Sequence, residues 1–182
     1  MSVVSLLAGK QLHRLIDAGV IDALHEHVNA ASIDVRLGEH FEFESTKGAV
    51  AYLAEKDSLL FCRNQFAEGE HIRIEPGEFL LAHTMETFNL PDNISAEFKL
   101  RSSVARSGLQ HMLAGWADAG FHGAQLTLEF KNVTQHHVLV IEPGMRIGQL
   151  VFYQHEPAGD NSYAMKGRYN GQRGVQPSKG AR

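Results

Sequence analysis

The sequence predicts a mainly β fold, an antiparallel barrel or jelly roll with one short N-terminal helix. From residue 71 onward, short runs of apolar or alternating residues are separated by turn residues. Two Glu-Pro-Gly turns, at 75–77 and 142–144, each lie between two such runs. We see no other repeat. We therefore expect one barrel domain over residues 1–155 and a flexible C-terminal tail over residues 156–182.

A short amphipathic helix is predicted within residues 6–18, because apolar residues recur there at helical spacing, at Leu12, Leu15 and Ile16. Gly19 follows the last of them and supplies the stop. Period-two alternation predicts strands at 33–37 and 41–43. Residues 45–70 are charged and follow neither period, so we expect irregular structure there.

The later strands follow from apolar runs that end at glycine, proline or asparagine. Their expected ranges are 71–74, 79–84, 94–100, 125–130, 138–141 and 145–152. Residues 88–93 contain Leu-Pro-Asp-Asn and predict a turn. Residues 114–121 place Asp118 between two glycines and predict a tight hairpin that carries one acid.

The composition narrows the class of protein. With 182 residues, 43% of them hydrophobic, the chain fits one soluble domain with a proper core. No apolar run reaches ~18 residues, and no basic flank precedes a long apolar stretch at the N-terminus. We therefore expect neither a membrane span nor a secretory signal. The single cysteine, Cys62, excludes an intramolecular disulfide and a multi-cysteine zinc site, and a reducing cytoplasm is the expected location.

Charge is unevenly distributed along the chain. Residues 161–182 carry five basic and no acidic side chains, whereas the first 160 residues carry 12 basic and 21 acidic ones. An acidic body argues against general nucleic-acid binding, which needs a basic surface on the fold. The basic tail would suit a small polyanion such as a nucleoside triphosphate. A disordered, solubilising end is the alternative that composition leaves open.

The stretch from 97 to 130 holds the strongest candidates for chemistry. Arg101 and Arg106 bracket two serines, and guanidinium groups with hydroxyls match the oxygens of a phosphate. A charged surface turn is the alternative. Asp118 could bind a sugar hydroxyl or form an ordinary Asx turn.

Glu129 lies in a predicted strand among apolar neighbours. Alternation places it on the same face as Thr127, and places Leu126, Leu128 and Phe130 on the other face. If the Glu129 face lines a pocket, the carboxylate is suited to general acid/base work. If that face meets solvent, Glu129 is an ordinary surface residue.

A metal site is not predicted. The eleven histidines are scattered, without a His-x-x-x-His motif on a helix or a cysteine cluster. The His-x-Glu and Pro-Cys-x-x-Cys signature of zinc-dependent nucleobase deaminases is missing too. We interpret Cys62 as a buried or incidental thiol.

Taken together, ordered motifs over most of the chain resemble the dCTP deaminase branch of the trimeric dUTPase superfamily. The motifs lie at 31–38, 75–79, 90–93, 101–106, 114–123, 126–129, 143–150 and 168–174. The resemblance implies a dUTPase-like distorted β-barrel, assembled as a homotrimer with shared active sites. It implies zinc-independent hydrolysis of dCTP to dUTP and ammonia, in the supply of dUMP and dTTP. Mg²⁺ would arrive on the triphosphate, and dTTP would be a feedback inhibitor.

The resemblance also assigns roles. Glu129 would move protons between water and cytosine, while Ser102 and Arg106 hold the water and stabilise charge at C4. The carbonyl of Ala114 would lie beside the base, and Asp118 would bind the deoxyribose 3′-hydroxyl. The implied nucleotide-binding set is Arg101, Ser102, Ser103, Val104, Ala105, Arg106, Asp118, Thr127, Leu128, Glu129, Gln149, Tyr163, Arg168 and Gln172. The last three belong to the tail, which would close over the triphosphate.

Two local features modify the comparison. Leu113 stands where the family commonly has threonine, and the segment 109–113 is one residue shorter than usual, which bears on base selectivity. Gly115-Trp116 resembles bifunctional relatives, which also cleave dUTP to dUMP and pyrophosphate. The alternatives are a plain dUTP diphosphatase, against which Glu129 argues, and a catalytically silent nucleotide-binding barrel, against which the retained polar residues argue.

Overall fold

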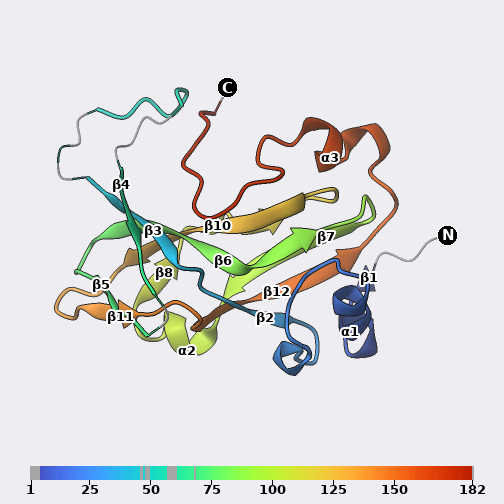
Figure 1. Ribbon diagram of the computed structural model, residues 1–182, viewed down its shortest axis with the longest axis horizontal. Coiled ribbons are helices and arrows are strands. Elements are labelled where there is room, and N and C mark those ends of the chain that lie inside the picture. Colours follow the sequence, from blue (N-terminus) through green and yellow to red (C-terminus); the bar gives the residue numbers. More distant parts are fainter. Residues whose placement is uncertain (1–4, 46, 48–49, 57–60, 68, 182) are drawn as a thin grey trace.

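Two five-stranded antiparallel sheets and one small two-stranded sheet form the body of the protein (Figure 1). The computed structural model describes residues 5–45, 47, 50–56, 61–67 and 69–181. The first sheet contains β1 (Ser5–Leu6), β2 (Ile33–Arg36), β7 (Ile94–Leu100), β9 (Trp116–Ala117) and β12 (Arg146–Gln154). The second contains β3 (His40–Glu44), β4 (Phe61–Gln65), β6 (Phe79–Asn89), β8 (Leu109–His111) and β10 (His122–Asn132). The small sheet pairs β5 (Ile72–Ile74) with β11 (Leu139–Ile141).

The hydrophobic core draws on both large sheets, as expected for a barrel or jelly roll. Its largest fully buried side chains include Phe152 from the first sheet and Phe41, Phe88 and Phe130 from the second. All strand pairs named above are antiparallel, so the predicted mainly β fold is confirmed.

The helices are short and peripheral. α1 (Lys10–Asp17) confirms the helix predicted within residues 6–18 and buries Leu12 and Leu15 against the core. α2 (Ser102–Ala105) and α3 (Tyr163–Lys166) are single turns, and 3₁₀ turns occur at His25–His27 and Gly159–Asn161. Within the described ranges no helix is long and apolar enough to cross a bilayer.

Three local predictions were wrong. The segment 45–70, part of which lies outside the described residues, contains β4, which pairs with β3. β6 continues to Asn89, so the predicted turn over 88–93 begins only after that residue. Residues 114–121 do not form a local hairpin, because β9 pairs with β7 of the first sheet while the following β10 pairs with β6 of the second.

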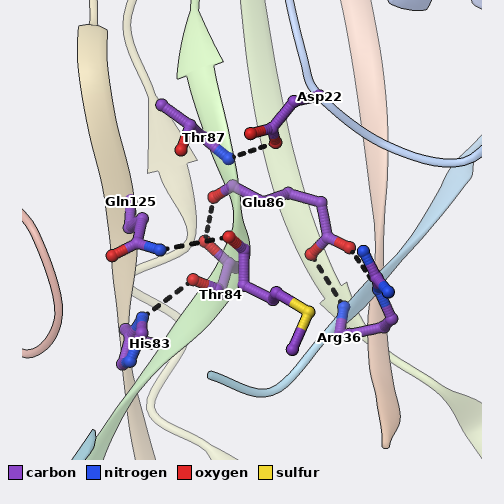
Figure 2. A network of polar contacts seen from close by, with 8 residues as sticks. Asp22, Arg36, His83, Thr84, Glu86, Thr87 and Gln125 are labelled. Carbon is purple, nitrogen blue, oxygen red and sulfur yellow. Dashed lines mark hydrogen bonds and ion pairs between the residues drawn. The ribbon is translucent and has the colours of Figure 1, made fainter. Parts of the chain in front are cut away.

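β6 contains a bulge just past Thr84, where the predicted strand over 79–84 ends. Gln125 faces Thr87 and Thr127 faces His83, so three residues of β6 oppose one residue of β10. The hydroxyl of Thr84 fills the gap. It accepts from the Leu126 backbone N–H at 3.0 Å, and it donates to the Glu86 carbonyl at 2.9 Å (Figure 2).

The bulge turns the side chain of Glu86 into the protein, where it meets Arg36 of β2. The Glu86 carboxylate accepts from the backbone N–H of Arg36 at 2.9 Å and from its Nε at 2.8 Å (Figure 2). The Glu86 side chain is fully buried, so this pair ties the two large sheets together in a poorly hydrated setting.

We predict that Glu86→Ala destabilises the protein by about 3–5 kcal/mol, because it leaves the Arg36 guanidinium partly buried without its partner. Urea unfolding followed by far-UV circular dichroism measures this change. The matched control is Glu75→Ala, which removes the exposed Arg73–Glu75 pair and should cost at most about 1 kcal/mol. Equal losses in the two variants would contradict the role of the buried pair.

Candidate functional site

The clearest candidate site is a cavity of about 450 Å³ above the outer face of β10. Barrel strands and the C-terminal segment both contribute to its wall. The lining residues are Leu53, Phe61, Phe79, Leu81, Ala114, Trp116, Ala117, Asp118, Phe121, Leu126, Thr127, Glu129, Tyr163, Tyr169, Gln172, Gln176, Pro177 and Ser178. A mostly apolar wall with few polar groups is typical of a site for an organic ligand.

The face of β10 that carries Glu129 lines this cavity, as one of the two sequence interpretations predicted. Leu128 and Phe130 are fully buried in the core, while Thr127 and Glu129 are half-buried on the cavity side. Glu129 faces Leu81 across the β10–β6 ladder, so an apolar side chain neighbours its carboxylate.

Glu129 has a histidine neighbour that sequence reasoning missed. His111 of β8 places Nε2 3.5 Å from Oε2 of Glu129, and the imidazole packs between Phe98 and Phe130. Both atoms are buried and lack a hydrogen-bond partner, so Glu129 keeps acceptor capacity for a ligand or water. The signal was the position of His111 on the strand beside β10, which became visible only through pairing.

Asp118 enters the cavity from the turn between β9 and β10. Its Oδ1 accepts from the indole N–H of Trp116 at 2.8 Å, which leaves its other oxygen for a ligand. Gly120 adopts φ of 91°, and a Cβ there would lie 2.2 Å from the hydroxyl of Ser162. Only glycine therefore lets this turn close against the C-terminal segment.

The C-terminal segment lines the cavity, and it runs beside β10, where it pairs with a free edge of that strand (Figure 1). β8 pairs only with residues 130–132 of β10, so the edge near Gln125 is open. Gln172 fills it: its carbonyl accepts from the Gln125 N–H at 3.0 Å, and its Nε2 donates to the Gln125 carbonyl at 2.7 Å. Further along, the N–H of Gln176 donates to the Thr127 hydroxyl at 3.1 Å.

Tyr163 and Gln172 bring polar atoms from this segment into the cavity. Burial raises the pKa of the Tyr163 phenol above its ordinary value of 10.0, and the charge of Asp118 adds to the rise. The phenol therefore keeps its proton at neutral pH. The Oε1 atom of Gln172 is buried and has no partner, so it too is an acceptor directed at a ligand.

The predicted site residues fall into two groups. Asp118, Thr127, Glu129, Tyr163 and Gln172 line the cavity, together with Ala114. None of the residues from Arg101 to Arg106 does so. In that motif Val104 is buried, whereas Ser102, Ser103, Ala105 and Arg106 are exposed.

The second group gathers around Asp34, a buried residue that sequence reasoning did not single out. Its carboxylate lies 3.5 Å from Arg101 and 3.4 Å from Arg146, and it accepts from Asn29. Gln149 sits opposite Asp34 in the β12–β2 ladder. Arg101 and Gln149 are thus held near each other, outside the cavity.

Two other predicted residues lie apart from the ligand-facing surface. The guanidinium of Arg168 donates to the carbonyl oxygens of Lys179 and Gly180, so it braces the C-terminal segment. Leu128 offers only its backbone, because its side chain is in the core.

Leu113 adopts φ of 62°, which is uncommon for leucine, and its side chain is exposed. Cys62 is exposed rather than buried.

A second cavity, of about 520 Å³, lies beside β3 and β4, and both arginines in its lining already have partners. Arg63 pairs with Glu42 at 2.6 Å, and Arg173 donates to the Thr87 hydroxyl. Burial lowers the pKa of His83, whose ring is bonded on both nitrogens. In the described part of the chain, no three His, Cys, Asp or Glu side chains gather as metal ligands.

Comparison with known proteins places this geometry in a family context. A family model described as dCTP deaminase-like matches residues 6–155. A protein named "dCTP deaminase, dUMP-forming" from Persephonella marina is 37% identical over 177 residues, covering 96% of each chain. One of the same name from Rhodococcus jostii is 37% identical over 182 residues, covering 96% of this chain and 95% of the relative.

A solved structure agrees on the fold. The crystal structure of 2′-deoxycytidine 5′-triphosphate deaminase from Agrobacterium tumefaciens aligns with a TM-score of 0.67 at 20% identity. The alignment covers 84% of this chain and 49% of that one.

We predict that Tyr163 ionises above pH 10, because burial disfavours the phenolate. Subtracting the alkaline absorbance titration of Tyr163→Phe from that of the wild type at 295 nm isolates this group among the four tyrosines. The free energy of unfolding should fall faster in the wild type than in the variant as the pH rises through 10 and beyond, because only the native state holds this proton. A difference midpoint at or below 10 would refute the assignment.

Proposed function

The chain belongs to the dCTP deaminase-like family, and we propose that it hydrolyses dCTP to dUTP and ammonia and then cleaves dUTP to dUMP and pyrophosphate. One observation supports this most directly: Glu129 lines an apolar cavity with a buried carboxylate oxygen that lacks a hydrogen-bond partner. Relatives named as dUMP-forming support the second step.

In the first step Glu129 acts as a base toward water. Free water has a pKa of ~15.7, so a carboxylate must accept its proton as the oxygen adds to C4 of cytosine. Glu129 passes this proton to N3 of the ring, the proton of the added hydroxyl moves to the amino group, the C4–N bond breaks as the C4 carbonyl forms, and ammonia leaves. The net reaction consumes one water and leaves Glu129 ionised for the next turnover.

Ser102 and Arg106 would hold the water and stabilise the negative charge that develops as it adds. They lie outside the cavity of their own chain, on an exposed single-turn helix. We therefore propose a homotrimer in which each cavity receives this motif from a neighbouring subunit. The backbone N–H of Ser103 would contribute a donor to the phosphates, whereas the N–H groups of Val104 and Ala105 already donate to the Arg101 carbonyl at 3.0 Å.

The remaining groups would hold the nucleotide. The backbones of Ala114, Thr127 and Leu128 would contact the base. Asp118 would accept from the 3′-hydroxyl, and Arg101 with Gln149, held beside Asp34, would contact phosphate or sugar. Ala114, Thr127 and Asp118 line the cavity, which supports their roles directly.

The segment 156–182 would act as a lid. Tyr163 and Gln172 already face the cavity from this segment, and Arg168 braces it. Mg²⁺ would arrive with the triphosphate and neutralise part of its charge, so the protein need not supply a metal ligand. dTTP, which shares the deoxyribose and triphosphate, would compete at the same site as a feedback inhibitor in the cytoplasm.

The second step requires water to attack the α-phosphorus and release pyrophosphate. The Trp116–Asp118 hydrogen bond supports it, because the indole holds one carboxylate oxygen of a residue that lines the cavity. Gly115 permits this arrangement, since a Cβ there would lie 2.8 Å from the carbonyl oxygen of Phe98.

Product analysis tests the whole proposal. The purified protein is incubated with dCTP and Mg²⁺, the nucleotides are resolved by ion-exchange chromatography, and ammonia is assayed in parallel. We expect dUMP, pyrophosphate and ammonia. Accumulating dUTP would restrict the activity to deamination. Intact dCTP with hydrolysed dUTP would indicate a plain dUTP diphosphatase, and binding without turnover a silent nucleotide-binding barrel.

We predict that Glu129→Gln lowers ammonia release by roughly 10²–10⁴-fold, because the amide cannot accept the proton of water. Nucleotide affinity and the melting temperature should stay close to wild type, since the amide has the same shape. Glu142→Gln, at an exposed turn, is the matched control. Ammonia release near the wild-type rate in Glu129→Gln would rule out this residue as the base.

A further inference from the structure

A buried serine and a histidine, Ser95 and His155, form a hydrogen-bonded pair behind the turn that carries Asp118. Ser95 lies on β7 and is 4% exposed. Its hydroxyl is 3.0 Å from Nε2 of His155 and also accepts from the backbone N–H of Ala119 at 3.1 Å. No step of the mechanism above uses either side chain.

The direction of each hydrogen bond follows from its partners. Nδ1 of His155 lies 2.7 Å from the carbonyl oxygen of Glu156, which can only accept, so Nδ1 carries the proton. Nε2 is then an acceptor, and the hydroxyl of Ser95 donates to it. This leaves a lone pair of Ser95 for Ala119. All hydrogen bonds in this series therefore run in one direction, from the Ala119 N–H through Ser95 to His155, and every group in the series has a partner.

This series of hydrogen bonds controls the geometry of Asp118. The Ala119 N–H belongs to the peptide that joins Asp118 to Ala119, so its hydrogen bond fixes the backbone from which the carboxylate projects. The opposite side of the turn is held by the C-terminal segment, because the Ala119 carbonyl accepts from the N–H of Tyr163 at 2.8 Å. Asp118 and Tyr163 both line the cavity.

His155 joins these two parts of the protein. It directly follows β12, where the C-terminal segment begins, and its own N–H donates to the carbonyl of Asn93 at 3.0 Å. The side chain of His155 therefore links the root of the C-terminal segment to the Asp118 turn through one buried hydroxyl.

We propose that Ser95 and His155 are positioning residues that hold Asp118 at the nucleotide 3′-hydroxyl and so set the preference for a substrate with that hydroxyl. The proposal rests on the proposed function, in which Asp118 accepts from that group. Misplacing a polar group by a fraction of an ångström weakens the hydrogen bond that it makes to the substrate. Binding of the base and the phosphates, which uses other residues, is unaffected.

The test compares dCTP with 2′,3′-dideoxycytidine triphosphate, which lacks the 3′-hydroxyl. In Ser95→Ala we expect KM for dCTP to rise roughly fivefold or more, while KM for the dideoxy analogue changes less than about twofold. kcat for dCTP should change less than KM. His155→Phe should behave in the same way, whereas His155→Gln should restore the preference, because its Oε1 can accept from Ser95.

A second readout does not depend on turnover. Trp116 is the only tryptophan in the sequence and donates to Asp118, so its fluorescence reports on this turn. We expect Ser95→Ala and His155→Phe to shift the emission maximum and increase quenching by acrylamide, and His155→Gln to resemble wild type. The stability control is Ile74→Val, a buried change on β5 that should alter neither the fluorescence nor the preference.

An unchanged preference for dCTP in both Ser95→Ala and His155→Phe would overturn the proposal. If the wild type turns over neither nucleotide, the proposed function fails instead, and the fluorescence decides the positioning role by itself. Emission identical to wild type in both variants would then overturn that role, and a shift that His155→Gln reverses would support it.

Discussion

The period-two alternation of β10 is the constraint on which the site depends. One face of this strand supplies Leu128 and Phe130 to the core, so the other face must carry Thr127 and Glu129 outward. A slip by one residue would bury the carboxylate and expose the core. The register is fixed on the β6 side by the Thr84 bulge, so burial of apolar surface positions a polar group for chemistry.

That outward face would be an ordinary solvated surface without the C-terminal segment. The segment converts it to a cavity by pairing with the edge of β10 that β8 leaves free. Along β10 it is held by hydrogen bonds through Asn170, Gly171, Gln172, Gly174 and Gln176. A lid that admits and releases a ligand must break these bonds each time it opens.

Local periodicity predicted the mainly β fold and the face of β10 that carries Glu129, whereas the other predicted residues of the cavity came from the resemblance to the family. The β10 alternation and the α1 spacing were visible directly. The errors share one cause: they concern pairing between distant segments. The length of β6 depends on a bulge held by Thr84 and Arg36, and two-residue β9 exists only against β7. His111 and Asp34 were missed since pairing, rather than a motif, brings each to its partner.

The central claim is that each active site combines the cavity of one chain with the arginine motif of another. Co-refolding equal amounts of Glu129→Gln and Arg106→Ala chains tests it most directly, since each variant is expected to be inactive alone. If the two residues come from neighbouring subunits of a ring, random mixing restores about a quarter of the wild-type sites, and ammonia release from dCTP reappears at about that level. A mixture as inactive as its parents would contradict a shared site.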